Sequence, residues 1–144
     1  MYIEEKVLFQ ASPEEVWDLL TNPEKTRQYM FGCELQSDWQ VGSPVHWKGK
    51  LEDGSEKIFV QGEVIEYEAP QKVTTTTFDP DSGLADVPEH HLQLTYELQK
   101  TEGGTLLTIR QGDYSVFEGG AERFEESKTG WLAVVIPAMK ELLT

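Results

Sequence analysis

The stretch GAERFEESKTGWLAVVIPAMKELL, residues 120–143, decides the fold. Pro137 lies inside it and removes the backbone bond to the Ala133 carbonyl, so we expect a helix that bends there. A helix with one apolar stripe must cover another element, and the preceding sequence predicts a sheet. The stripe recurs at spacings of three, four or seven residues and consists of Phe124, Trp131, Val135, Met139 and Leu142.

Two helix starts follow a first strand near the N-terminus. Residues 3–9 alternate so that their apolar side chains share one strand face. Ser12 can cap a helix with Pro13 at its first position, and Glu15 completes a capping box. Residues 22–24, Asn-Pro-Glu, repeat this signal. The sequence therefore predicts two short helices that must cover something else.

Residues 44–111 have the pattern of antiparallel strands. The long strand across residues 58–67 changes its apolar phase after Val64, which indicates a bulge near Gly62. Residues 79–89 contain two prolines and a glycine and predict a loop. The order of strand, two small helices, strand meander and long terminal helix predicts a single α+β domain over residues 1–144.

Composition narrows the classes of function. Twelve basic and 26 acidic residues give a net charge of −14, which disfavours nucleic acid and anionic membrane surfaces and predicts a monomer or weak dimer. No apolar run approaches the ~20 residues needed to span a bilayer. Cys33 is the only cysteine, so no internal disulfide can form and we expect a reducing cytoplasmic location.

Metal chemistry has little support in the sequence. His90 and His91 are adjacent, and neighbours on a strand point to opposite faces, so they cannot easily share one metal ion. His46 is the only other histidine, and a zinc site would need distant carboxylates. The acidic segment 79–83 lacks the later ligands of a calcium loop. We therefore expect no metal and no cofactor.

No catalytic constellation stands out either. Cys33 has no histidine near it in sequence, and Glu63 and Glu97 have outward strand phases. Arg110 and Arg123 could anchor a ligand carboxylate, although Arg110 alternates outward against Ile109. The sequence therefore names no catalytic residue and favours a binding protein over an enzyme.

Several short segments, taken together in their order, carry a family resemblance. They are residues 11–17 (ASPEEVW), 21–24 (TNPE), 62–64 (GEV) with Pro70, 103–108 (GGTLLT) and 130–132 (GWL). In these features the chain resembles the START-like (SRPBCC) superfamily, and within it the group related to the C-terminal domain of the activator of Hsp90 ATPase. The resemblance implies a helix-grip (Bet v 1/START-like) fold, in which a curved antiparallel sheet wraps around the long C-terminal helix.

Three positions depart from the family pattern. Tyr29-Met30-Phe31 stands where a tryptophan is usual, Thr74 to Thr77 replace larger apolar residues, and Pro137 is unusual in the last helix. The first two departures would enlarge or polarise a cavity, so the ligand of a relative cannot be transferred to this chain.

A curved sheet that wraps one helix leaves a gap, which becomes a ligand cavity where side chains do not fill it. The alternative is that the same side chains simply pack the core. By strand and helix phase, the side chains expected to face this space are Val45, Trp47, Val60, Val64, Thr75, Thr77, Leu94, Tyr96, Leu107, Ile109, Phe124, Trp131, Val135 and Met139.

The resemblance implies binding of a small hydrophobic or amphipathic ligand, lipid-like or polyketide-like. It leaves two alternatives: a co-chaperone-like role in the stress response with a chaperone as partner, or a cyclase or hydrolase acting on a bound aromatic molecule. A buried ionisable group in the cavity with a perturbed pKa would favour the enzyme.

Overall fold

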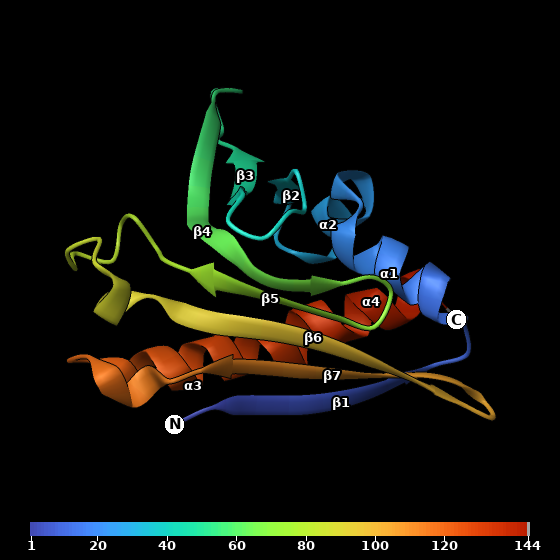
Figure 1. The fold of residues 1–144 in the computed structure, drawn as a ribbon. Helices are drawn as coiled ribbons and strands as arrows, with labels where there is room; N and C mark the ends of the chain where they lie inside the picture. Colours follow the sequence, from blue (N-terminus) through green and yellow to red (C-terminus); the bar gives the residue numbers. More distant parts are fainter. Residues whose placement is uncertain (144) are drawn as a thin grey trace.

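The structure, a computed structural model, describes residues 1–143, which form one antiparallel seven-stranded sheet and a long helical segment behind it (Figure 1). The sheet order is β1-β7-β6-β5-β4-β3-β2. The strands are β1 (Ile3–Phe9), β2 (Glu34–Ser37), β3 (Pro44–Lys50), β4 (Glu56–Glu68), β5 (Lys72–Thr77), β6 (Leu92–Thr101) and β7 (Gly104–Gly112). The helices are α1 (Pro13–Thr21), α2 (Pro23–Tyr29), α3 (Gly120–Gly130) and α4 (Ile136–Leu142). The predicted α+β helix-grip fold is confirmed.

The two short helices begin where the sequence predicts. The Ser12 hydroxyl accepts a hydrogen bond from the Glu15 amide, 3.2 Å away, and the Ser12 amide donates to the Glu15 carboxylate at 3.3 Å. The Asn22 side chain caps α2 by accepting from the Glu24 amide at 3.0 Å. The phenol of Tyr29 donates to the Leu19 carbonyl at 2.8 Å, which ties α2 to α1 over one end of the sheet.

Strand β4 bends because it carries two bulges. Phe59 is an extra residue opposite β3, between the pairs Trp47–Val60 and Lys48–Ile58, and Ile65 is an extra residue opposite β5. The predicted bulge near Gly62 is thus a pair of bulges on either side of it. A Cβ at Gly62 would overlap the carbonyl oxygen of Thr76, so this glycine permits the close approach of β4 and β5.

The C-terminal segment covers one face of the sheet, and a π-helical turn interrupts it at Trp131–Val135. The Ile136 amide bonds to the Trp131 carbonyl, five residues back, one residue before Pro137. The wider turn accommodates the proline that the sequence expects to bend the helix. It also rotates α4 relative to α3, so Ile136 joins the buried face and Leu142 is 37% exposed, against the predicted stripe.

Two local expectations need correction. Strand β2 was not predicted, because its four residues contribute only one fully buried side chain, Leu35. His90 and His91 do not lie in a strand: His90 ends a short 3₁₀ turn, Pro88–His90, and His91 precedes β6.

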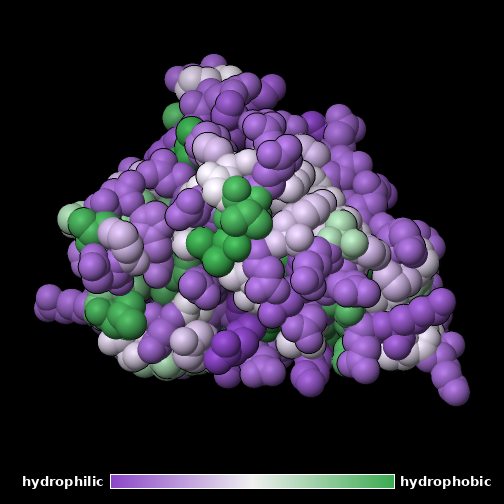
Figure 2. All heavy atoms as spheres, in the orientation of Figure 1, coloured by the Kyte–Doolittle hydropathy of each residue, from purple (hydrophilic) through white to green (hydrophobic). Residues whose placement is uncertain are grey.

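The visible face of the sheet is mainly hydrophilic, with scattered apolar side chains (Figure 2). No helix within residues 1–143 has the length and apolar character to cross a membrane.

Candidate ligand cavity

A cavity of about 550 Å³ lies between the sheet and the C-terminal helical segment. It sits where β5 ends, β6 begins and β7 ends, since Thr77 pairs with Leu92 and Gln93 pairs with Gly112. The volume falls within the usual range for small-molecule sites. Toward the other end of β6 and β7, α1 packs against these two strands and core side chains fill the interior.

The cavity wall is mostly apolar. Strands β3 and β4 contribute Trp47, Phe59 and Val60, and the consecutive residues Phe59 and Val60 both reach the cavity beside the β4 bulge. The helical segment contributes Trp131 and Val135 from its π turn. The remaining apolar side chains on the wall are Met30, Phe31, Cys33, Phe78, Leu84, Leu92, Leu94 and Phe117.

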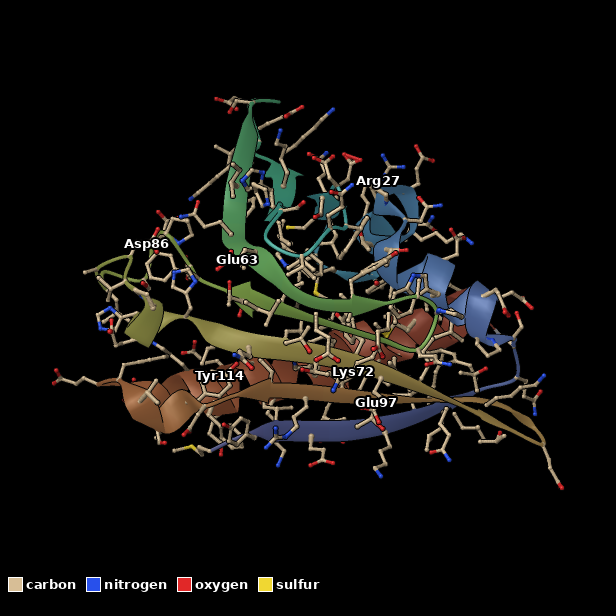
Figure 3. The ribbon with its side chains drawn as sticks, viewed as in Figure 1. Arg27, Glu63, Lys72, Asp86, Glu97 and Tyr114 are labelled. Carbon is tan, nitrogen blue, oxygen red and sulfur yellow. The ribbon has the colours of Figure 1, made fainter. Side chains whose placement is uncertain are left out.

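Two buried hydroxyl groups on this wall have no hydrogen-bond partner within residues 1–143. They are the Thr77 hydroxyl, in a residue 7% exposed, and the Tyr114 phenol, in a residue 1% exposed. Figure 3 shows Tyr114 at the end of the sheet beside α3. A buried polar group without a partner costs roughly 1–3 kcal/mol. Because the two oxygen atoms have almost no accessible surface, they do not face the open space of the cavity.

Burial raises the pKa of the Tyr114 phenol, because the charged form would be poorly solvated. The Ser127 hydroxyl, also on the cavity wall, acts in the opposite direction, because hydrogen bonding to the phenolate lowers the pKa of Tyr114. Tyr114 therefore stays neutral and can both donate and accept at ordinary pH.

Charged groups on the wall include Asp79, Arg123 and Glu126. Arg123 donates to the Ser82 carbonyl at 2.9 Å, and its guanidinium lies 5.7 Å from the centre of the Phe117 ring. This contact joins the loop 79–91 to α3 beside the cavity. Arg123 uses one of its five N–H donors in this bond, and the other donors can serve a ligand carboxylate.

The rim includes an exposed aromatic ring. Phe31 follows α2, has a positive φ of 53° and is 65% exposed, yet it contributes to the cavity wall. A Cβ at Gly130 would lie 3.5 Å from the Cζ atom of Phe31, so the ring rests near the backbone at the end of α3. The position of the Phe31 ring thus depends on how the segment after α2 packs against the end of α3, which is distant in sequence.

The structure divides the predicted cavity residues into two groups. Trp47, Val60, Thr77, Leu94, Trp131 and Val135 meet on the wall. The others do not line the cavity: they pack along the sheet and helix, where the interior is filled, and they are Val45, Val64, Thr75, Tyr96, Leu107, Ile109, Phe124 and Met139. Strand phase identifies inward side chains but not which part of the inward face stays open.

Sequence reasoning missed several wall residues because they lie outside regular strands. Tyr114 begins a 3₁₀ turn, Tyr114–Val116, between β7 and α3, and Phe78 directly follows β5. Strand alternation gives no direction for either. The sequence offers only a weak signal for these two residues, namely an aromatic side chain just after the end of a strand.

Two reactive side chains on the cavity wall, Cys33 and His90, are constrained by their surroundings. Burial raises the pKa of the Cys33 thiol, so the reactive thiolate is disfavoured. The Nδ1 atom of His90 lies 2.6 Å from the Ala85 carbonyl, which occupies that ring nitrogen. Within the described chain, no three histidine, cysteine or acidic side chains cluster so as to hold a metal ion.

The curved sheet, the covering helix and the cavity between them define a protein of the helix-grip class. Residues 10–144 match the family model of the Activator of Hsp90 ATPase homolog 1-like proteins, and the chain belongs to this family. No curated protein matches the sequence.

Solved structures agree with this assignment. The protein ChR145 from Cytophaga hutchinsonii is 26% identical, with a TM-score of 0.76 over 99% of this chain and 92% of that one. PFC0360w, an HSP90 activator from Plasmodium falciparum, is 20% identical with a TM-score of 0.70, covering 99% and 95%. An Aha1 dimer from Colwellia psychrerythraea is 15% identical with a TM-score of 0.72, covering 99% and 96%. The last two show a shared fold.

Proposed function

We propose that this protein binds a small hydrophobic or amphipathic molecule, lipid-like or polyketide-like, in the cavity between the sheet and the C-terminal helical segment. The observation that carries the proposal is a cavity of about 550 Å³ whose wall is mostly aromatic and aliphatic, with a few polar side chains. An apolar wall with a few polar groups is the usual form of a small-molecule site.

The energetics favour an apolar guest. Each buried CH₂ group contributes about 0.8 kcal/mol, and the aromatic side chains of Trp47, Phe59 and Trp131 offer large contact surfaces. With no catalytic constellation on the wall, the proposed activity is binding without chemical conversion. The lone Cys33 supports a reducing cytoplasm as the place of action.

Tryptophan fluorescence tests binding directly, because Trp47 and Trp131 lie on the cavity wall. Trp39 instead stacks on Tyr67, with ring centres 5.8 Å apart, away from the cavity. We expect fatty acids, flavonoids or sterols to change the emission of the wild type and of Trp39→Phe, with a smaller change in Trp131→Phe. Unchanged emission and no thermal stabilisation at ligand excess would contradict the proposal.

Family membership supports a second candidate, a co-chaperone-like partner of Hsp90. The family is described as Activator of Hsp90 ATPase homolog 1-like, and the Plasmodium falciparum neighbour is an HSP90 activator. A pull-down with the cognate Hsp90, combined with its ATPase turnover, tests this candidate. No co-elution and unchanged turnover would remove it.

A further inference from the structure

Arg123 is the one Lys or Arg side chain that the described chain places on the cavity wall. It lies on α3 and is half-buried. One terminal nitrogen donates to the Ser82 carbonyl at 2.9 Å, and the guanidinium lies 5.7 Å from the centre of the Phe117 ring. These two contacts hold the guanidinium in place beside the cavity, while its other N–H donors remain available to a ligand.

No acidic side chain within residues 1–143 forms an ion pair with Arg123. The ion pairs of this part of the chain belong to the N-terminal amino group, four lysines and His91. Asp79 and Glu126 also line the cavity, but both are exposed and water screens their charges. The half-buried guanidinium on the wall is therefore a fixed positive charge without a counter-ion from the described chain.

The positive charge and an apolar ring share one side of the helical segment. Ser127, Gly130 and Trp131 line the cavity at four, seven and eight residues after Arg123, which are the spacings of one helix face. Eight residues of helix rise about 12 Å. This face thus presents the cation beside loop 79–91 at one end and the Trp131 indole at the other.

We infer that Arg123 anchors the carboxylate of an amphipathic ligand whose apolar body occupies the cavity toward Trp131. The inference rests on the proposed function and narrows its ligand class to organic acids, such as fatty acids and aromatic carboxylic acids. A guanidinium can bind a carboxylate through two parallel N–H···O bonds, which are stronger than bonds between neutral groups. The apolar body gains free energy by burial against the aromatic wall.

The net charge of the chain makes the inference sharply testable. A charge of −14 opposes an anion, so a preference for an acid over a neutral molecule with the same ring requires a local cation. Arg110 offers a comparison with Arg123. It lies on β7 with its guanidinium 4.0 Å from the centre of the Tyr2 ring, and it does not line the cavity. Replacing either arginine with glutamine changes the net charge equally.

Three probes with one ring system test the inference: 2-naphthoate, 2-naphthol and 2-naphthylmethylammonium, each titrated into the full chain by calorimetry at neutral pH. We expect 2-naphthoate to bind about three- to tenfold more tightly than 2-naphthol, the net effect of a charged hydrogen bond at a partly exposed site. We expect 2-naphthylmethylammonium to bind more weakly than 2-naphthol, because the guanidinium repels it.

Variants assign the effect to one arginine. The readout is the ratio of the 2-naphthoate and 2-naphthol affinities, because a loosened contact with loop 79–91 would weaken both probes alike. In Arg123→Gln the preference for 2-naphthoate should disappear. In Arg123→Lys part of it should remain, since the charge stays and the planar donor fork is lost. Arg110→Gln is the matched control and should leave the ratio unchanged, and circular dichroism verifies that each variant is folded.

The outcomes separate the anchor from the proposed function. Equal binding of 2-naphthoate and 2-naphthol by the wild type overturns the anchor and leaves the binding function intact. A preference that persists in Arg123→Gln, or that disappears equally in Arg110→Gln, overturns the assignment to Arg123. Tightest binding of 2-naphthylmethylammonium overturns the anionic ligand class. Failure of all three probes to bind the wild type overturns the proposed function and the anchor together.

Discussion

The indole N–H of Trp131 donates a hydrogen bond to the side-chain oxygen of Gln111, 3.0 Å away. Trp131 begins the π turn of the covering helix, and Gln111 lies near the end of β7. Both residues line the cavity, so this bond joins the helix to the sheet across the wall of the proposed site. It fixes the position of one of the two tryptophan side chains on the cavity wall.

Removing the acceptor should destabilise the protein. Gln111→Met keeps the size of the side chain but leaves the Trp131 indole N–H without its partner, so we expect the free energy of unfolding to fall by about 1–3 kcal/mol. Urea denaturation followed by circular dichroism measures the change. In a Trp131→Phe background the same substitution should cost much less, and an equal cost in both backgrounds would show that the bond does not matter.

The close approach at Gly62 predicts a strong effect of one methyl group. Gly62→Ala would place a Cβ against the Thr76 carbonyl and force β4 away from β5, so we expect a loss of at least about 2 kcal/mol of unfolding free energy. Gly103→Ala is the matched control, because no atom lies within 4 Å of its added Cβ. Similar stability of the two variants in urea would contradict the observed packing.

Buried tyrosines predict alkaline destabilisation. Burial raises the pKa of Tyr29, Tyr96 and Tyr114, and the nearby Tyr96 adds to the shift of Tyr29. Because the folded pKa lies above the unfolded one, the contribution to stability is complete below about pH 10 and is lost as pH rises further. The slope should reach about 1.4 kcal/mol per pH unit for each tyrosine that titrates only on unfolding.

Urea titrations between neutral and strongly alkaline pH measure this slope. Tyr96→Phe should make it shallower, because one of the three contributing groups is then absent. A wild-type stability that stays constant above pH 10, or a slope unaltered in Tyr96→Phe, would mean that these phenols ionise freely in the folded state.

The Cys33 thiol reports on the cavity. Cys33 is 8% exposed and lies on the cavity wall, and burial raises the pKa of its thiol. Alkylation by iodoacetamide, which needs the thiolate, should therefore be slow. Its rate should still increase with pH where the rate of an ordinary thiol has become constant. Bound 2-naphthol should slow the reaction about tenfold at ten times its dissociation constant. Mass spectrometry follows the product, and urea-unfolded protein, which has no cavity, should show no protection.

The fold could be predicted from sequence because its determinants are local. Ser12 and Glu15 fix the start of α1, and Pro137 marks the region where the helix departs from regular α geometry. Strand alternation identified inward side chains such as Trp47 and Leu94. These features depend on neighbours a few residues apart, which a single sequence contains.

The site could be predicted only in part because its boundaries are not local. Val45 and Trp47 share a strand face, yet only Trp47 reaches the cavity. Tyr114 joins the wall through a turn between β7 and α3, and Phe59 through a bulge. Both positions depend on how distant elements meet.

A crystal structure of the protein grown with 2-naphthol is the most direct test of the account. We predict density for the naphthalene ring beside Trp131 and Leu94, which line the cavity. An interior closed by the protein's own side chains, with no guest between the sheet and the helix, would contradict the central claim.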